Sequence, residues 1–429
     1  MEKEVPGNYG ETVWGTKTLT EFNDNVNHND NLSMNKIFIE LIQVALGTRE
    51  GLSRVPTGAE WEALYEEAGN QAIVGVLLEG LQRCMVHDSL QSKAAKPSAR
   101  FTVNLPLEVK LQWIGEVQMI EEQNRVMSKA CRDVVEQFEK DGFKCCVLKG
   151  QANLRYYPEE MRLRRSCGDI DIWARPNVVK SEKGKVKSGA AHPVRRTLEY
   201  VERKHELTGL CWLHCNFDYS EDVPVEVHFR PSFMNEPIHN HRLQRFFKNH
   251  ESHELNELGF GVLPVEEDVV YQMNHIYRHL LDEGVGLRQI VDYFFLFRKF
   301  NEHELPQIDH KLSTNITIKN LGMKRFAGAL MYVMKEVCGM SDEELLCEPN
   351  EKDGRFLLSE IMTAGNFGQA DPRMGELNTS SLLKRQVSQA WRRFKRNMRF
   401  VTSYPGEVIW EPVARMEHFA WKKLRLWRV

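Results

Sequence analysis

Apolar positions with a helical period dominate the first folded stretch of the chain. They begin in MNKIFIELIQVAL at Met34 and continue to about residue 140. Thr57 and Glu60 have the spacing of a capping box, which predicts that a helix starts before WEALYEEAGNQAIVGVLLEGL. Residues 34–140 are therefore expected to form a helical N-terminal region. The preceding residues 1–33 are polar and rich in Asn, so a disordered leader is expected there.

The pattern changes from helix to strand after residue 140. Asp141 and Gly142 end the helical period, FKCCVL predicts a buried strand, and KGQANLRYYPEE predicts a turn into a short helix that stops before Pro158. Strands are also expected in CGDIDIWARP, LCWLHCNFDY and VPVEVHFRP, with a loop at KSEKGKVKSG and a helix around VRRTLEYVERKHEL. Helical patterns return after Pro264.

These elements predict an α+β protein, in which a small mixed β-sheet is flanked by helical N- and C-terminal regions. The sheet is expected within a core of residues 141–235. Residues 236–429 are expected to form a helical C-terminal domain with a basic tail.

Two aspartates stand out in the strand CGDIDIWARP. Asp169 and Asp171 alternate with Ile170 and Ile172, so the strand period of two sends both carboxylates to one face. Glu226 lies in the later strand VPVEVHF. Converging carboxylates repel one another unless a cation lies between them, and Mg²⁺, with Mn²⁺ as a substitute, binds carboxylate oxygens together with substrate phosphates. The pattern predicts a metal–nucleotide site for phosphoryl or nucleotidyl transfer.

The order of these motifs resembles the nucleotidyltransferase superfamily, whose core has a strand, a Gly-containing turn, a helix, a strand with DxD or DxE, and a third acid on a later strand. More narrowly, LKG, the Tyr-rich helix, the Arg before GDIDIW, VEVHF, HIYRHL and GLRQIVDY resemble a bacterial branch labelled uncharacterised nucleotidyltransferase. The likeness covers most of the chain from about residue 36.

The resemblance implies transfer of an NMP group from a nucleoside triphosphate to an acceptor hydroxyl, with release of pyrophosphate. The acceptor is a sugar, a small molecule or a protein hydroxyl. By position, Asp169 and Asp171 match the metal-binding pair and Glu226 matches the third acid. Lys149 and Gly150 stand where the superfamily usually has Gly-Ser. Because that Ser normally helps to hold a phosphate, the departure puts the nucleotide geometry in question.

Several basic residues near these motifs are candidate nucleotide ligands. Lys149 and Arg165 are expected to face phosphates, because a guanidinium just before the aspartates can pair with a triphosphate. His228 follows Glu226 by two residues and shares its face, so it is a secondary candidate for substrate or metal contact; the alternative is an ordinary hydrogen-bonded histidine. Arg288 is the other secondary candidate. Its simplest role is a local helix pair with Asp292, four residues later.

Other histidines and cysteines have simpler interpretations. His275 and His279 are four apart on a predicted helix, but no third zinc ligand is evident, so core or cleft histidines are expected. Cys211, His214 and Cys215 are interpreted as structural.

Composition adds limits on class and location. The chain has 429 residues, 42% hydrophobic and 27% charged, with a net charge of −3, which is typical of a globular protein. Its nine cysteines suggest reduced thiols. Without a secretory signal or a run of about 20 apolar residues, a cytoplasmic protein with no transmembrane segment is expected.

The most polarised part of the chain is residues 381–429, with twelve Lys or Arg, three Glu and four Trp. Such a segment can bind nucleic acid or an anionic membrane surface. A helix face packed on an acidic neighbour is the preferred interpretation because the whole chain is not basic. Nucleic acid is therefore not an expected partner.

Two alternative functions remain from the sequence. A DxD-type glycosyltransferase would use a nucleotide sugar, but it usually has a nucleotide-binding βα unit well before the DxD, where this chain has a helical region. A non-catalytic nucleotide-binding module on the same fold stays open because Gly-Ser is absent. The third acid on VEVHF favours the nucleotidyltransferase.

Overall fold

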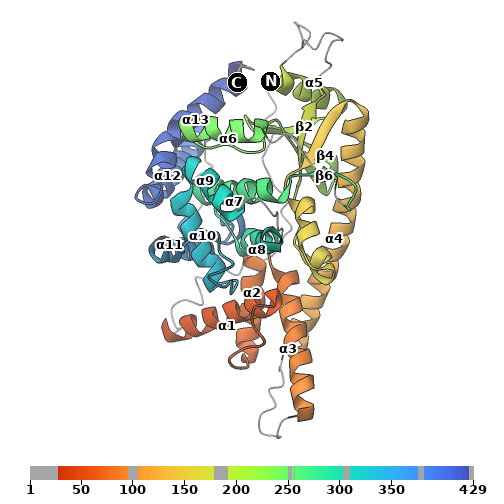
Figure 1. The fold of residues 1–429 in the computed structure, drawn as a ribbon, viewed down its shortest axis with the longest axis vertical. Coiled ribbons are helices and arrows are strands. Elements are labelled where there is room, and N and C mark those ends of the chain that lie inside the picture. Colours follow the sequence, from red (N-terminus) through yellow and green to blue (C-terminus); the bar gives the residue numbers. More distant parts are fainter. Residues whose placement is uncertain are drawn as a thin grey trace.

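A computed structural model describes residues 28–94, 105–177, 192–249, 254–255, 257–302, 310–374 and 381–424. It shows an α+β protein, as predicted, in which helices surround one mixed sheet (Figure 1). The predicted loop KSEKGKVKSG and residues 1–27 of the predicted leader lie outside the described residues.

Four helices form the N-terminal part of the structure: α1 (His28–Leu46), α2 (Gly58–Asn70), α3 (Val74–Ala94) and α4 (Leu107–Lys140). The capping box of α2 is confirmed, because the Thr57 side chain accepts from the Glu60 amide and the Glu60 side chain accepts from the Thr57 amide. Helix α1 begins at His28, inside the segment for which disorder was expected.

The sheet has the strand order β3-β4-β5-β2-β1-β7-β6. Its strands are β1 (Phe143–Val147), β2 (Ile170–Pro176), β3 (Leu207–Leu210), β4 (His214–Ser220), β5 (Val223–His228), β6 (Glu254–Leu255) and β7 (Gly261–Val262). Strand β2 pairs antiparallel with β1 and parallel with β5, and β4 pairs antiparallel with β5. The strands that carry the predicted acids are therefore direct neighbours.

The segments between strands cover the sheet and carry the turn at Lys149. Strands β1 and β2 are joined by two 3₁₀ helices, η3 (Gly150–Tyr156) and η4 (Glu159–Arg164), where the sequence predicted one short helix. Helix α5 (Pro193–Lys204) lies between β2 and β3. The rings of Phe138 on α4, Phe143 on β1 and Tyr200 on α5 pack together, so α4 and α5 cover the same face of the sheet.

The C-terminal part of the chain is helical. Its helices are α6 (Pro237–Asn249), α7 (Val265–Asp282), α8 (Leu287–Glu302), α9 (His310–Asn320), α10 (Lys324–Glu336), α11 (Glu351–Ala364), α12 (Leu382–Phe400) and α13 (Pro405–Leu424), with 3₁₀ turns η5 (Asn366–Gly368) and η6 (Pro372–Met374). The ring of Phe247 on α6 packs against Trp173 on the face of the sheet opposite α4 and α5. On β2, Ile170 and Ile172 belong to the apolar cluster with α4 and α5. Trp173 belongs to the cluster with α7 and α8. Both faces are thus covered, which buries the polar positions of β2.

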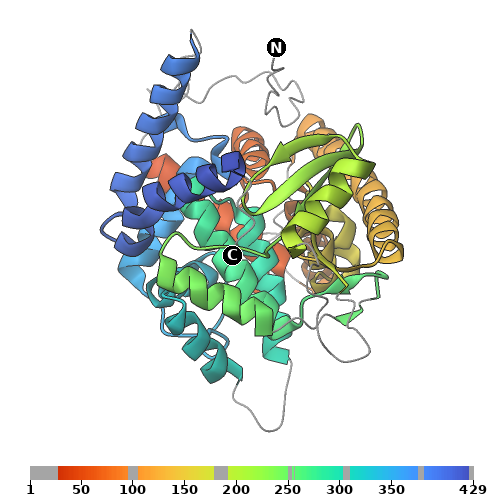
Figure 2. The same ribbon diagram turned by 90° about the horizontal axis from the view of Figure 1, so that it is seen from above.

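One apolar cluster joins the N- and C-terminal helices, because it contains residues of α1, α3, α7, α8 and α10. Figure 1 shows α1 to α3 below α8, and Figure 2 shows α12 and α13 together at one edge of the molecule. In the described part of the chain, no helix combines the length and apolar character needed to cross a bilayer.

Candidate active site

The register of three strands gathers polar side chains on the face of the sheet toward α7. Asp171 on β2 is directly opposite Glu226 on β5, which is opposite Asn216 on β4. In the next row, His228 is opposite His214. Side chains opposite one another on neighbouring strands point to the same face. The strand pairing therefore builds a polar patch from residues that are far apart in sequence.

Lys149 and Asp169 complete this patch from the ends of their strands. Lys149 Nζ lies 3.6 Å from Asp169 Oδ2 and 3.2 Å from Asp171 Oδ2. The turn requires Gly150, whose φ is +59°, and a Cβ at this position would lie 3.2 Å from the Asp169 carbonyl oxygen. The two aspartates share a face, as their alternation predicted. Asp171 is fully buried, and Asp169 is partly exposed.

Cationic side chains of the protein lie beside the carboxylates. Sequence reasoning placed a metal ion between the carboxylates and Lys149 on the phosphates. In the structure, the Lys149 ammonium itself is the cation beside Asp169 and Asp171. His228 Nε2 lies 2.9 Å from Asp171 Oδ1 and 3.5 Å from Glu226 Oε2, so it also faces the carboxylates. The protein's own cations therefore compensate the acids.

The pKa shifts follow from this packing. Burial raises the pKa of Asp169, and the charge of Asp171 raises it further. Burial disfavours the charged form of Glu226, but His228, His214 and Lys149 hold its pKa well below its usual range. Burial alone would lower the pKa of Lys149, yet the surrounding carboxylates raise it above its ordinary value. Lys149 is therefore cationic and Glu226 anionic at neutral pH.

Two further residues lie beside the site: His214, which the sequence analysis interpreted as structural, and Asn216, which it did not single out. His214 Nε2 lies 3.5 Å from Glu226 Oε2, and Asn216 Nδ2 donates to Glu226 Oε1 at 3.2 Å. Although burial opposes it, the pairing of His214 with Cys211 raises the pKa of His214 to about 9 and lowers that of Cys211 to about 7. The alternation of HCNF against VEVHF across a short turn was the signal for this placement. Cys215 is buried on the other face, as a structural residue.

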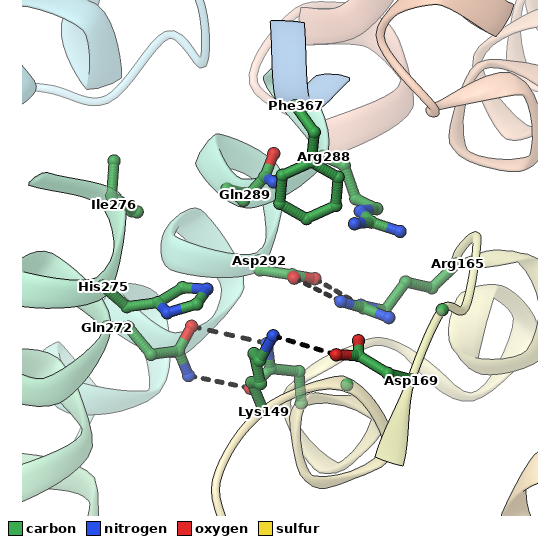
Figure 3. A pocket seen from close by; sticks show the side chains of 13 residues that line it. Lys149, Arg165, Asp169, Gln272, His275, Ile276, Arg288, Gln289, Asp292 and Phe367 are labelled. Atoms are coloured by element: carbon green, nitrogen blue, oxygen red, sulfur yellow. Dashed lines mark hydrogen bonds and ion pairs between the residues drawn. The ribbon is translucent and has the colours of Figure 1, made fainter. Parts of the chain in front are cut away.

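A small pocket opens beside Lys149 and Asp169. Its opposite wall comes from α7 and α8 and contributes Gln272, His275 and Gln289 (Figure 3). Burial and the neighbouring His279 hold the pKa of His275 well below its ordinary value, so its imidazole is neutral. This places His275 in the cleft, consistent with the prediction of a core or cleft histidine.

The contacts of the two candidate arginines differ from those expected. Arg165 Nε and Nη2 each lie 2.7 Å from an oxygen of Asp292, a buried bidentate pair. The predicted helix pair between Arg288 and Asp292 is therefore wrong, because the carboxylate accepts from Arg165 and from Tyr157 instead. Arg288 donates through Nη1 to the Ser166 carbonyl at 3.3 Å, and its buried Nε has no hydrogen-bond partner. Arg288 thus keeps a donor for a ligand.

Phe367 lines the cavity beside Arg288 (Figure 3). Its ring centroid is 5.2 Å from the Arg288 guanidinium carbon. Its φ of +54° is in the left-handed region, which costs a non-glycine residue on the order of 1 kcal/mol and is typical of positions that a functional site constrains. The sequence did not single out Phe367, because no local pattern marks a residue that the tertiary fold brings to a cavity.

The polar patch has donor atoms suited to a metal ion. Ligand atoms of Asp171, Glu226 and His228 all lie within 4.8 Å of one another. The buried Oδ2 of Asp171 accepts no hydrogen bond, although the Lys149 ammonium is near. Such an oxygen suits a cation. The set differs from the predicted one by including His228, and Asp169 lies at its edge beside Lys149.

Comparison with curated proteins and with solved structures found no match. A family model described as uncharacterised nucleotidyltransferase matches residues 57–339. That span contains every strand of the sheet and each predicted site residue from Lys149 to Arg288, whereas Phe367 lies beyond it. The match covers well over half of the chain, and it agrees with the acids on neighbouring strands. The protein therefore belongs to the uncharacterised nucleotidyltransferase family.

Proposed function

We propose that the protein transfers an NMP group from a nucleoside triphosphate to an acceptor hydroxyl and releases pyrophosphate, in a reaction that depends on Mg²⁺ or Mn²⁺. One observation carries this proposal. The parallel pairing of β2 with β5 sets Asp171 against Glu226 beside a cavity that also holds Asp169 and the unpaired donor of Arg288. This arrangement suits a metal-bound triphosphate.

Asp169, Asp171 and Glu226 are the proposed metal ligands. A bound divalent ion would neutralise phosphate charge and polarise the reacting phosphoryl group. His228 holds Asp171 and Glu226 through its Nε2, at 2.9 Å and 3.5 Å, and so orients both acids. An imidazole is a better ligand for Mn²⁺ than for Mg²⁺, so His228 binds directly only when the ion is Mn²⁺.

Lys149 has the role of an exchangeable internal cation in this proposal. Without substrate, its ammonium neutralises Asp169 and Asp171. When the metal–nucleotide complex takes over that neutralisation, the ammonium becomes available to the phosphates. This accounts for Lys-Gly at the position where the superfamily usually has Gly-Ser, because an ammonium binds phosphate as a point charge.

Arg288 and Phe367 are the proposed nucleotide contacts on the far side of the cavity. The Arg288 guanidinium donates to phosphate oxygens, in place of Arg165, whose guanidinium is already held by Asp292. Phe367 offers an aromatic face beside Arg288, on which a nucleobase can stack. Arg165 then contributes indirectly, by fixing Asp292 and η4 next to α8.

A second candidate is a non-catalytic nucleotide-binding module. The observation that favours it is the Lys149 ammonium, which balances both aspartates without a metal. In such a module, a nucleoside triphosphate would bind equally well with and without Mg²⁺, and no pyrophosphate would form.

The first test is thermal unfolding with each of the four nucleoside triphosphates, with and without Mg²⁺. The variants are Asp169→Asn/Asp171→Asn and the control Asp218→Asn, whose carboxylate is exposed on β4. The proposal expects one triphosphate to raise the unfolding midpoint only with Mg²⁺, in the wild type and in the control, because ligand binding stabilises the native state. A metal-independent shift in all three proteins would favour the module.

The second test follows label from α-³²P and γ-³²P forms of the triphosphate that binds, with candidate hydroxyl acceptors and with the protein itself. Label from the α position on an acceptor, together with pyrophosphate release, identifies nucleotidyl transfer. Label from the γ position alone would contradict the proposal in favour of kinase chemistry.

A further inference from the structure

Helix α12 exposes an apolar stripe. Val387, Trp391, Phe394 and Met398 are 53–61% exposed and recur every three or four residues, so they lie along one side of the helix. Arg396, two positions from Phe394 and Met398, is only 4% exposed and lies on the opposite side. The apolar side of α12 therefore faces away from the protein.

The inward side of α12 is charged. Arg399 Nη2 lies 3.3 Å from Glu360 Oε2, and Arg396 Nη2 donates to the Glu283 carbonyl at 2.6 Å. Packing of basic residues on an acidic neighbour, which the sequence suggested, is thus confirmed for Arg399. The outward side is apolar rather than charged, which the sequence interpretation did not anticipate. A surface helix of a globular protein usually packs its apolar side on the core and exposes its charged side, so α12 has the reverse arrangement.

Helix α13 repeats the arrangement. Ile409, Val413, Met416 and Leu424 are 43–67% exposed at helical spacing, whereas Trp421 is buried. Phe419, 63% exposed, lies on the margin of this stripe. The Asn397 side chain of α12 donates to Glu411 of α13 at 3.2 Å. Figures 1 and 2 both show the two helices together at one edge of the molecule. We call the exposed apolar side chains of both stripes together the α12–α13 apolar face.

Basic side chains border the α12–α13 apolar face. Those that are exposed and lie on the two helices are Lys384, Arg385, Lys395, Arg415, Lys422 and Lys423. Within residues 381–424, Glu417 is the one acid that is exposed to the same degree. The Lys395 ammonium lies 5.6 Å from the centroid of the Trp391 ring, so positive charge and aromatic surface are adjacent.

We propose that the α12–α13 apolar face lies on an anionic lipid surface, with its aromatic and aliphatic side chains in the interface and its lysines on the headgroups. Helices that bind membranes in this way combine Trp, Phe and Leu on one side with flanking Lys and Arg. A second copy of the chain is disfavoured as the occupant, since a symmetric interface would oppose this basic border to itself. The proposal does not depend on the reaction proposed above.

The test is co-sedimentation of the full chain with vesicles of phosphatidylcholine alone and with 30% phosphatidylglycerol. The apolar variant is Trp391→Gln/Phe394→Gln and the charge variant is Lys384→Gln/Lys395→Gln. The control is Ile238→Gln/Ile316→Gln, which removes equally exposed side chains, 60% and 52%, from α6 and α9. All four side chains of the first two variants are exposed, so folding is expected to be unchanged, as circular dichroism can verify.

Wild type and control should bind the anionic vesicles, and added salt should weaken the binding. Loss of the two lysines should weaken binding to the anionic vesicles about 25-fold, because each lysine contributes about fivefold. The apolar variant should sediment no more than protein without vesicles. Equal binding by all four proteins, or none by the wild type, would overturn the proposal. The proposal would also be overturned if light scattering showed that the wild type is a dimer and that Trp391→Gln/Phe394→Gln is a monomer. That result would show that a second copy of the chain covers the face.

Discussion

Replacement of Lys149 by Met tests whether the ammonium stands in for a metal ion between the two aspartates. Met keeps a side chain of similar length and removes the charge. In the variant, Asp169 and Asp171 lose their nearest cation, so the folded protein should become less stable and should bind a divalent ion more readily.

The magnitude follows from the distances. At an effective dielectric constant of about 20, unit charges at 3.2 Å and 3.6 Å attract by about 5 kcal/mol each before desolvation is counted. Removal of one partner from a buried ion pair costs about 3–5 kcal/mol. Lys149 and Asp169 retain some solvent, so we expect a loss of roughly 3 kcal/mol in the free energy of unfolding. Mg²⁺ at a hundred times its dissociation constant would raise the free energy of unfolding of the variant by about 2.7 kcal/mol.

The assay is urea unfolding at pH 7 with and without Mg²⁺, on wild type, Lys149→Met and Lys140→Met. Lys140 pairs with Glu136 on the exposed surface of α4, so its replacement should change the free energy of unfolding by less than about 0.5 kcal/mol. Mg²⁺ should stabilise Lys149→Met more than wild type, because the ammonium no longer competes. If a variant unfolds too early to measure, Mn²⁺ binding followed by electron paramagnetic resonance gives the same comparison.

Two outcomes would refute this reasoning. One is a free energy of unfolding for Lys149→Met equal to that of the wild type without metal. The other is an equal effect of Mg²⁺ on both proteins, which would show that the ammonium does not occupy the place of the ion.

Four further predictions concern single side chains. Asp171→Asn should abolish pyrophosphate release with the fold retained; full activity would refute the metal site. Arg288→Ala should weaken nucleotide binding about 10- to 100-fold, the effect of a lost charged hydrogen bond, in calorimetric titration; unchanged affinity would return the phosphate role to another cation. Phe367→Gly should weaken binding about tenfold yet raise stability by up to about 1 kcal/mol, because φ is relieved; lower stability in urea unfolding would contradict this. Burial raises the pKa of Glu407 to about 7 from 4.5, so the folded state retains a proton that the unfolded state releases. Stability should therefore fall by up to about 3 kcal/mol as pH rises from 4.5 to 7, and Glu407→Gln should flatten that slope in urea unfolding.

The local sequence pattern was sufficient to predict the helices and strands that position the site residues. Alternation placed Asp169 and Asp171 on one face of β2, and the capping box marked the start of α2. Both signals work at short range, because they depend on strand period and on backbone groups a few residues apart. The order of acids along the chain likewise identified the family.

The partners of charged groups were decided by tertiary structure. Asp292 lies four residues from Arg288 but pairs with Arg165, which the fold brings across from η4 with both donors aligned. The spacing in the sequence predicted that Asp292 pairs with Arg288, whereas the buried bidentate geometry favours Arg165. Strand register likewise brought His214 to Glu226.

Helix α12 shows the same division between sequence and fold. Its sequence determined that one side is apolar and the other basic, because the spacing of Trp391 and Phe394 against Arg396 fixes the two sides of any helix. Only the packed structure decided that the basic side turns inward, where Glu360 and the Glu283 carbonyl lie. A sequence pattern sets the two faces of a helix, and the surface on which the helix packs selects which one is buried.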